Sequence, residues 1–120
     1  MSRLLVVEDS PAIGLLLRRR LEKAGHRVEV VTGATAALER LDGSSGDELE
    51  VVLSDVNLPG IGGIELTDRI REGHPELPLI LVTAVELEPG DSNRADAVIG
   101  KPIDFDLLLG TIERLAGRPG

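Results

Sequence analysis

The most constraining feature of the sequence is a short apolar run that stops at an acidic side chain. Residues 51–55 read VVLSD, and Pro59 and Gly60 follow shortly after. Such a run is typical of a strand buried on both faces, and the Pro-Gly pair predicts a turn at the end of the strand. The strand would therefore deliver one carboxylate, that of Asp55, to the edge of a sheet.

Four more short apolar runs lie along the chain, at residues 4–7, 28–31, 79–82 and 97–99, with segments of helical periodicity between them. Strands that alternate with helices predict right-handed βαβ crossovers and a single parallel sheet. A chain of 120 residues that is 42% hydrophobic, with one Phe and no Tyr or Trp, can bury one aliphatic core. We therefore expect one α/β domain over residues 1–120.

The first and last helices carry the clearest signals. Asp9 or Ser10 can cap the first helix ahead of Pro11, which predicts a start there and a stop at Gly25. Asp104 is the expected cap of the last helix. The residues expected to face the core are Ile13, Leu16, Leu17 and Leu21 in the first helix and Phe105, Leu108, Ile112 and Leu115 in the last.

Charge and composition exclude several classes of function. A net charge of -8 disfavours direct binding to nucleic acid or to an anionic membrane, and the basic cluster at residues 18–20 reads as a solvated helix face. The lack of Cys excludes disulfides and thiolate metal sites. No apolar run approaches the roughly 18 residues needed to cross a bilayer, so a cytoplasmic location is expected.

His26 and His74 are expected at the surface or at helix C-termini.

Polar side chains follow four of the five expected strands: Glu8 and Asp9, then Asp55, then Thr83 and Ala84, then Lys101. The carboxyl ends of parallel strands lie at one edge of the sheet, where ligands bind. Two carboxylates about 4 Å apart repel by ~4 kcal/mol at an effective dielectric near ~20. A hard cation would relieve this repulsion, and oxygen ligands favour Mg²⁺. Acids, a metal, a lysine and a threonine together suit phosphoryl transfer.

This set, with Pro59 and Gly63 after Asp55 and Pro102 after Lys101, resembles the receiver domain of bacterial two-component response regulators over essentially the whole chain. The resemblance implies a flavodoxin-like doubly wound sheet of strand order 2-1-3-4-5. It also implies a cis peptide bond before Pro102.

The resemblance further implies a role for each matching residue. Asp55 would accept a phosphoryl group from a sensor histidine kinase or a phosphotransfer protein. Lys101 would pair with the phosphoryl group, Thr83 would donate its hydroxyl and Ala84 its backbone N–H. Mg²⁺ would be held by Asp9 and Asp55 directly, by Glu8 through water and by the backbone carbonyl of Asn57. The domain would then switch an output domain or a downstream protein, with a homodimer as one possible form, and would catalyse at most its own phosphorylation and dephosphorylation.

Two positions depart from the family pattern. Val98 stands three residues before Lys101, where most receivers have Tyr or Phe. The segment between Thr83 and Lys101 is shorter than is usual in the family and contains Pro89 and Gly90 where the fourth helix should run. We expect this helix to be one or two turns at most, or missing, which would remodel the surface it contributes to.

Two other readings compete with a phosphoacceptor. A hydrolase of the haloacid dehalogenase type also uses an Asp nucleophile, Mg²⁺ and Lys, but it needs a second acid two residues after the nucleophile, where this chain has Asn57. A pseudo-receiver would act as a phosphorylation-independent binding module. The complete acidic set and Lys101 argue against this second alternative, whereas Val98 and the interrupted fourth helix keep it open.

Overall fold

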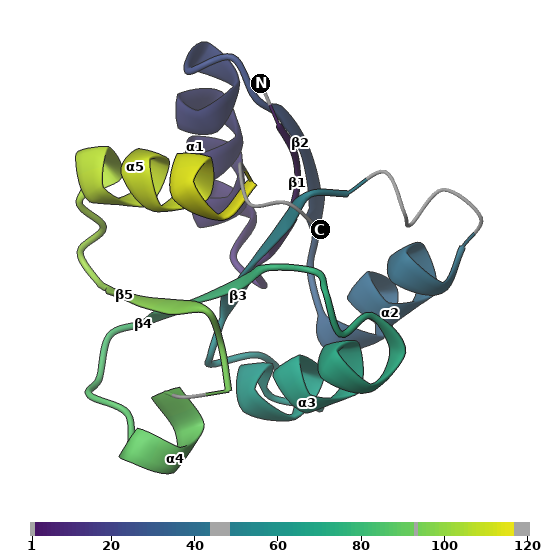
Figure 1. The fold of residues 1–120 in the computed structure, drawn as a ribbon. Helices are drawn as coiled ribbons and strands as arrows, with labels where there is room; N and C mark the ends of the chain where they lie inside the picture. Colours follow the sequence, from purple (N-terminus) through teal and green to yellow (C-terminus); the bar gives the residue numbers. More distant parts are fainter. Residues whose placement is uncertain (1, 44–48, 93, 117–120) are drawn as a thin grey trace.

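The computed structural model describes residues 2–43, 49–92 and 94–116. Strands and helices alternate along it (Figure 1). The strands are β1 (Arg3–Val7), β2 (Arg27–Val31), β3 (Val51–Asp55), β4 (Leu79–Thr83) and β5 (Ala97–Gly100). The helices are α1 (Pro11–Lys23), α2 (Ala34–Asp42), α3 (Gly63–Gly73), α4 (Pro89–Ser92) and α5 (Phe105–Ala116).

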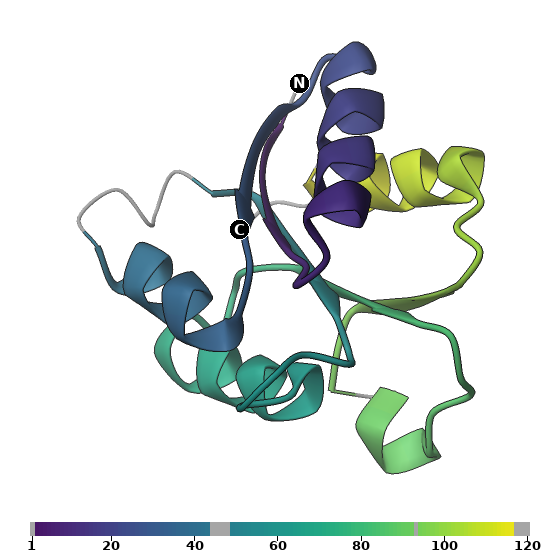
Figure 2. The ribbon, with the colours of Figure 1, turned by 180° about the vertical axis from the view of Figure 1, so that it is seen from behind.

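The five strands form one parallel sheet in the order β2-β1-β3-β4-β5. Helices α1 and α5 cover one face of the sheet, and α2 and α3 cover the other (Figures 1 and 2). This arrangement is the flavodoxin-like doubly wound fold, with the strand order that the resemblance to receiver domains implied. The order reverses direction at β1 and β3, and ligands bind beside the carboxyl ends of such strands.

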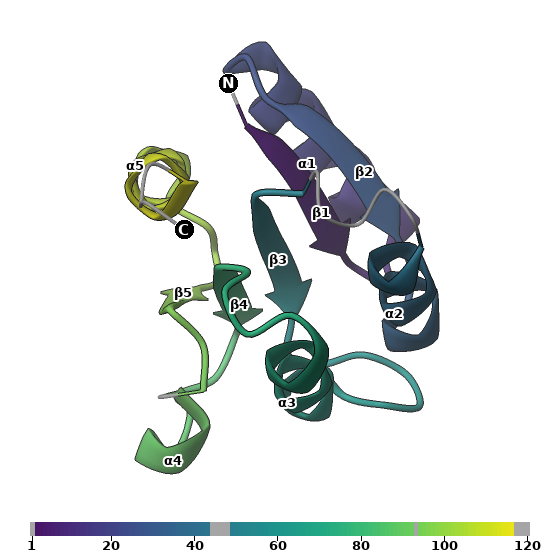
Figure 3. The same cartoon turned by 45° about the vertical axis from the view of Figure 1, so that its right-hand side comes forward.

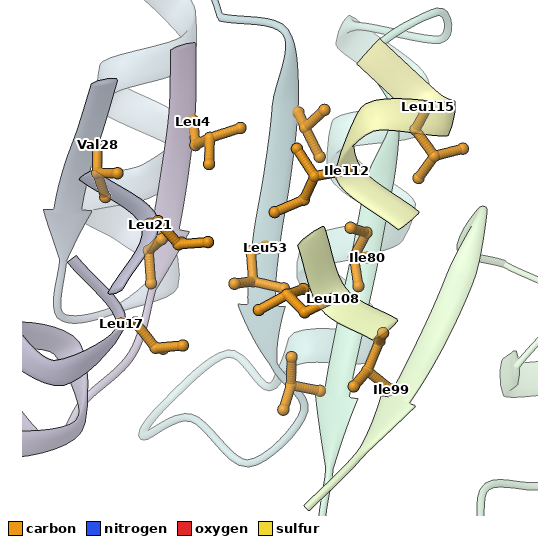
Figure 4. Packing of buried hydrophobic residues seen from close by; sticks show 13 residues of the cluster. Leu4, Leu17, Leu21, Val28, Leu53, Ile80, Ile99, Leu108, Ile112 and Leu115 are labelled. Carbon is orange, nitrogen blue, oxygen red and sulfur yellow. The ribbon is translucent and has the colours of Figure 1, made fainter. Parts of the chain in front are cut away.

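Two hydrophobic clusters lie on opposite faces of the sheet. In β1, Leu4 and Val6 pack toward α1 and α5, whereas Leu5 and Val7 pack toward α2 and α3. Side chains alternate between the two faces because a strand has a period of two residues. Figure 4 shows the cluster on the α1 and α5 side, where Leu108 and Ile112 lie over the middle of the sheet.

Helix α1 begins as expected but buries a different stripe. The hydroxyl oxygen of Ser10 accepts a hydrogen bond from the backbone N–H of Ile13 at 3.4 Å, and Pro11 opens the helix. The prediction for Ile13 and Leu16 was wrong, since they are 38% and 50% exposed. The buried residues are Gly14, Leu17 and Leu21. Gly14 packs closely on β2, since a Cβ there would come 3.0 Å from Val30 Cγ1, and a glycine suits this position in the buried stripe.

Helix α5 follows the prediction closely. A carboxylate oxygen of Asp104 accepts the N–H of Leu107 at 3.2 Å and caps the helix. Leu108, Ile112 and Leu115 are buried, as predicted. Phe105 is only partly buried, and the guanidinium of Arg20 lies 4.2 Å from the centre of its ring.

The fourth helix is a single turn, as predicted: α4 has four residues, and it lies below β5 in Figure 3. Polar contacts fix the chain that follows it. Asp96 accepts hydrogen bonds from Nη2 of Arg71 at 2.6 Å and from the N–H of Leu79 at 2.8 Å, and Arg71 also donates to the carbonyl of Arg94. Side chains from α3 therefore hold a segment that a longer α4 would otherwise organise.

The two histidines differ from each other. His74 is the C-cap of α3, as expected, and its Nε2 lies 3.4 Å from Asp42 of α2. His26 also follows a helix, but it is only 8% exposed, so a surface position for it was wrong. Its Nδ1 accepts the N–H of Ser2 at 3.1 Å, and burial lowers its pKa below the ordinary value.

Among the described helices, none has the length and apolar character to cross a membrane.

Candidate functional site

The polar residues predicted at the strand ends line one pocket of about 480 Å³. Glu8 and Asp9 follow β1, Asp55 ends β3, Thr83 ends β4, and Lys101 follows β5. A parallel sheet places all these ends on one edge, which is why residues far apart in the sequence meet here. The full lining is Glu8, Asp9, Ser10, Ile13, Asp55, Val56, Asn57, Thr83, Ala84, Val85 and Lys101.

Asp55 lies at the centre of the site and is only 7% exposed. Its Oδ2 lies 2.7 Å from the Nζ of Lys101, and its Oδ1 accepts the backbone N–H of Asn57 at 2.9 Å. The two contacts fix the carboxylate from two sides. A charge-assisted hydrogen bond of this length is among the stronger polar interactions in proteins.

Glu8 is the most deeply buried acid of the site, with 3% of its surface exposed. Burial raises the pKa of its carboxyl above the ordinary value, the hydrogen bond from the N–H of Ser10 to Oε2 acts in the opposite direction, and the charge of Asp55 raises it further. Its other oxygen lies 3.8 Å from the Nζ of Lys101. One backbone N–H donor and one nearby cation therefore stabilise the buried carboxylate of Glu8.

Lys101 balances the negative charge of the pocket. Burial by itself would lower the pKa of this lysine, but the hydrogen bond and charge of Asp55, together with the two other carboxylates, raise it above the ordinary value. The ammonium group therefore stays charged at neutral pH. The peptide bond between Lys101 and Pro102 is cis, as expected.

The three carboxylates form a set that could hold a metal ion. One oxygen each from Glu8, Asp9 and Asp55 lies within 4.8 Å of the others, and Asp9 is exposed to solvent. All the donors are oxygen atoms and carry negative charge, which suits a hard divalent cation such as Mg²⁺. Asn57 lies at the rim of the same pocket with its side chain exposed.

Thr83 and Ala84 lie in the pocket wall, but the hydroxyl of Thr83 does not contact Asp55. It donates to the carbonyl of Val85 at 3.0 Å and accepts the N–H of Val85 at 3.1 Å. Ala84 is exposed and leaves the pocket open to solvent on that side. The sequence did not indicate Val85 as part of the site, because Val85 makes its polar contacts through the backbone and its side-chain type does not predict them.

Ser10 and Ile13 were also missed as site residues. Both had been assigned to α1 only, Ser10 as its cap and Ile13 as part of its core, yet both line the pocket, and the N–H of Ser10 binds Glu8. A cap residue directly after two acids was the available signal for Ser10.

Val98, where an aromatic is usual, is 37% exposed and borders a second, more open pocket with Val85 and Leu87.

The fold and this pocket define a doubly wound α/β domain with a clustered acidic site and one lysine at the carboxyl edge of its sheet. The family model of the response regulator receiver domain matches residues 4–113. The chain therefore belongs to the receiver domain family of two-component systems.

Curated relatives agree with this assignment. The chain is 34% identical over 119 residues to the response regulator receiver protein CpdR of Brucella abortus, with 96% of this chain and 97% of CpdR covered. It is 38% identical over 120 residues to the transcriptional regulatory protein TcrA of Mycobacterium tuberculosis, with 97% of this chain covered. The chain spans 46% of TcrA and 12% of the sensor histidine kinase RcsC of Escherichia coli, to which it is 34% identical.

A solved structure is similar over the whole domain. The response regulator protein TrrA of Thermotoga maritima, in complex with Mg(2+)-BeF, superposes with a TM-score of 0.85 at 30% identity, covering 96% of this chain and 99% of that one.

Proposed function

We propose that Asp55 accepts a phosphoryl group from a histidine kinase or a phosphotransfer protein in a Mg²⁺-dependent reaction, and that the domain thereby switches a partner. The observation that carries this proposal is the arrangement around Asp55: the Nζ of Lys101 lies 2.7 Å from Oδ2, and one oxygen each of Glu8 and Asp9 lies within 4.8 Å of an Asp55 oxygen. A nucleophilic carboxylate beside a fixed cation is what phosphoryl transfer to an acid requires.

The step transfers one phosphoryl group. A carboxylate oxygen of Asp55 attacks the phosphorus of a phosphoimidazole, a new O–P bond forms, and the N–P bond breaks. The electron pair leaves with the imidazole nitrogen, and the product on this chain is an acyl phosphate. Lys101, which pairs with Asp55 before the reaction, turns its ammonium group to a phosphoryl oxygen. The hydroxyl of Thr83 leaves Val85 and donates to another oxygen.

The acidic residues are suited to hold the metal ion that such a transfer needs. Asp9 and Asp55 would bind Mg²⁺ directly, Glu8 through water and Asn57 through its backbone carbonyl. Bound Mg²⁺ would offset the charge of about -1.5 to -2 that the phosphoryl group brings beside the acids. The TrrA structure is a complex with Mg(2+)-BeF, which supports this part of the proposal.

Partners and context follow from the family. We infer that a sensor histidine kinase or a phosphotransfer protein supplies the phosphoryl group in the cytoplasm, and that an output domain or a separate protein, or a second copy of this chain, responds to it. Residues 1–120 would form one receiver domain. Its chemistry would be limited to its own phosphorylation and dephosphorylation, with no turnover of an external substrate.

Incubation with acetyl phosphate and Mg²⁺ tests the proposal. Intact-mass spectrometry should detect one added phosphoryl group that is stable to acid and labile to base. The adduct should be absent in Asp55→Asn and when EDTA removes the metal, and it should persist in the matched control Asp106→Asn, because Asp106 is exposed on α5. If neither acetyl phosphate nor a histidine kinase modifies the wild type, the proposal is wrong, and a phosphorylation-independent binding module is the better description.

A further inference from the structure

Gly63, the first residue of α3, lies directly against the backbone of the residue that carries the candidate phosphoacceptor. A Cβ atom added to Gly63 would come 2.3 Å from the carbonyl oxygen of Asp55, 2.6 Å from the Cα of Val56 and 3.0 Å from the carbonyl carbon of Asp55. Real Cβ atoms essentially never approach other atoms closer than 3.0 Å. Because all three neighbours are backbone atoms, no side-chain rotation can make room.

Hydrogen bonds fix both sides of this contact. The N–H of Gly63 donates to the carbonyl of Val56 at 2.9 Å, and the N–H of Val56 donates to the carbonyl of Val82 in β4 at 3.0 Å. On the helix side, the fully buried hydroxyl of Thr67 donates to the carbonyl of Gly63 at 2.8 Å. Neither the helix nor the strand can therefore retreat without breaking bonds, and an added Cβ would push on the peptide between Asp55 and Val56.

We propose that Gly63 is a positioning residue for the reaction at Asp55, an inference that rests on the proposed function of that residue. The first turn of α3 packs directly against the Asp55–Val56 peptide because Gly63 has no side chain. This packing contact sets the distance from the Asp55 carboxylate to Lys101 and to the other acids. Transfer reactions are sensitive to such placement, since a shift of about 1 Å can lower a rate ~100-fold.

Gly63→Ala tests the contact with little other change. Gly63 lies in a helix and has no positive φ angle, so the backbone conformation suits alanine and the added Cβ is what the substitution tests. The matched control is Gly62→Ala at the N-cap of α3, where a Cβ would meet only the carbonyl oxygen of Val56 at an ordinary 3.7 Å. Any difference between the two variants reports the contact with Asp55.

Two quantities should be measured on wild type and both variants: the rate of phosphorylation by acetyl phosphate at saturating Mg²⁺, and the dissociation constant for Mg²⁺ alone by titration calorimetry. We expect Gly63→Ala to slow phosphorylation by at least about tenfold and to weaken Mg²⁺ binding, with Gly62→Ala within about twofold of wild type. If Gly63 had only a structural role, Gly63→Ala would lower the stability toward urea, but the folded variant would bind Mg²⁺ and be phosphorylated as wild type is. That result would overturn the inference.

Thr67→Val serves if Gly63→Ala does not fold. It keeps the glycine, removes the hydroxyl that anchors its carbonyl and should slow phosphorylation about threefold or more, by loosening the placement of the helix. An unchanged rate and an unchanged Mg²⁺ affinity in this folded variant would overturn the inference. A wild type that binds Mg²⁺ but is not phosphorylated contradicts the proposed function alone, and the Mg²⁺ affinities of the variants then still decide the role of Gly63.

Discussion

The hydroxyl of Thr83 and the backbone of Val85 make two hydrogen bonds with each other, one in each direction, at 3.0 and 3.1 Å. The hydroxyl therefore donates its one proton within its own loop. To donate to a phosphoryl oxygen, the Thr83 hydroxyl would have to release the carbonyl of Val85, because it has only one proton to donate. Val85 is 66% exposed, so a rearrangement of Val85 would change the surface of the domain.

Thr83→Val should loosen the loop without a large change in shape. Each lost hydrogen bond contributes on the order of 1 kcal/mol, so amide hydrogen exchange at Val85 should accelerate about tenfold or more. NMR detection of exchange measures this directly. Thr111→Val is the matched control, because the hydroxyl of Thr111 donates only to the carbonyl of Leu107 within α5. Equal protection of Val85 in wild type and Thr83→Val would show that the two bonds do not hold the loop.

Lys101→Met should destabilise the protein in the absence of Mg²⁺. The raised pKa of Lys101 means that its contribution to stability is complete at neutral pH and is lost only as the pH rises through the pKa of the folded state. Removing the ammonium leaves Asp55 and Glu8 buried beside each other, and the free energy of unfolding should fall by about 1–3 kcal/mol.

Urea unfolding at neutral pH with EDTA measures this effect, and added Mg²⁺ should reduce it. Lys23→Met, on the exposed last turn of α1, should change stability by less than about 0.5 kcal/mol. A Lys101→Met variant as stable as wild type without metal would mean that the lysine does not offset the acidic charge.

His26→Asn should remove a pH-dependent part of the stability. Burial lowers the pKa of His26, so its contribution is complete above the unfolded value of 6.5 and is lost as the pH falls through the lowered pKa of the folded state. Asparagine can still accept the N–H of Ser2 but does not titrate in this range. Urea unfolding at about pH 7.5 and about pH 5.5 should show wild type losing more stability than the variant on acidification. Parallel losses in the two proteins would contradict the assignment.

Asp96→Ala should release the chain after α4. Asp96 accepts hydrogen bonds from Arg71 and from the N–H of Leu79, and both partners lie in a partly buried region, so the expected cost is about 1–3 kcal/mol. Urea unfolding gives the cost, and faster hydrogen exchange at the Leu79 amide locates it. Glu65→Ala removes an exposed pair with Arg69 on α3 and should cost at most about 0.5 kcal/mol. Similar costs in the two variants would show that Asp96 holds nothing in place.

The fold was largely predictable because strand and helix periods are local properties of the sequence. The five apolar runs became the five strands, Ser10 and Asp104 became helix caps, and Pro89 and Gly90 reduced the fourth helix to one turn. The meeting of Glu8, Asp9, Asp55, Thr83 and Lys101 in one pocket was also predictable, because parallel strands place their carboxyl ends on one edge.

Local periodicity did not decide which side of a helix is buried when several sides are apolar. Ile13 and Leu16 fit a helical stripe as well as Leu17 does, but the face that packs on the sheet is the one with Gly14, where a Cβ would come 3.0 Å from Val30. The same holds for His26, whose burial depends on the N-terminal segment that lies beside it.

The sequence alone determined which chemical groups this protein brings to one edge of its sheet, because the strand ends follow from the pattern of apolar runs and parallel strands place those ends on one edge. Only the tertiary structure decided how those groups face each other: Lys101 bound to Asp55, Thr83 turned to Val85, and Gly63 seated on the strand that carries the acid. These relationships depend on contacts of a few ångströms between segments distant in the chain, and close packing rather than local propensity sets such distances.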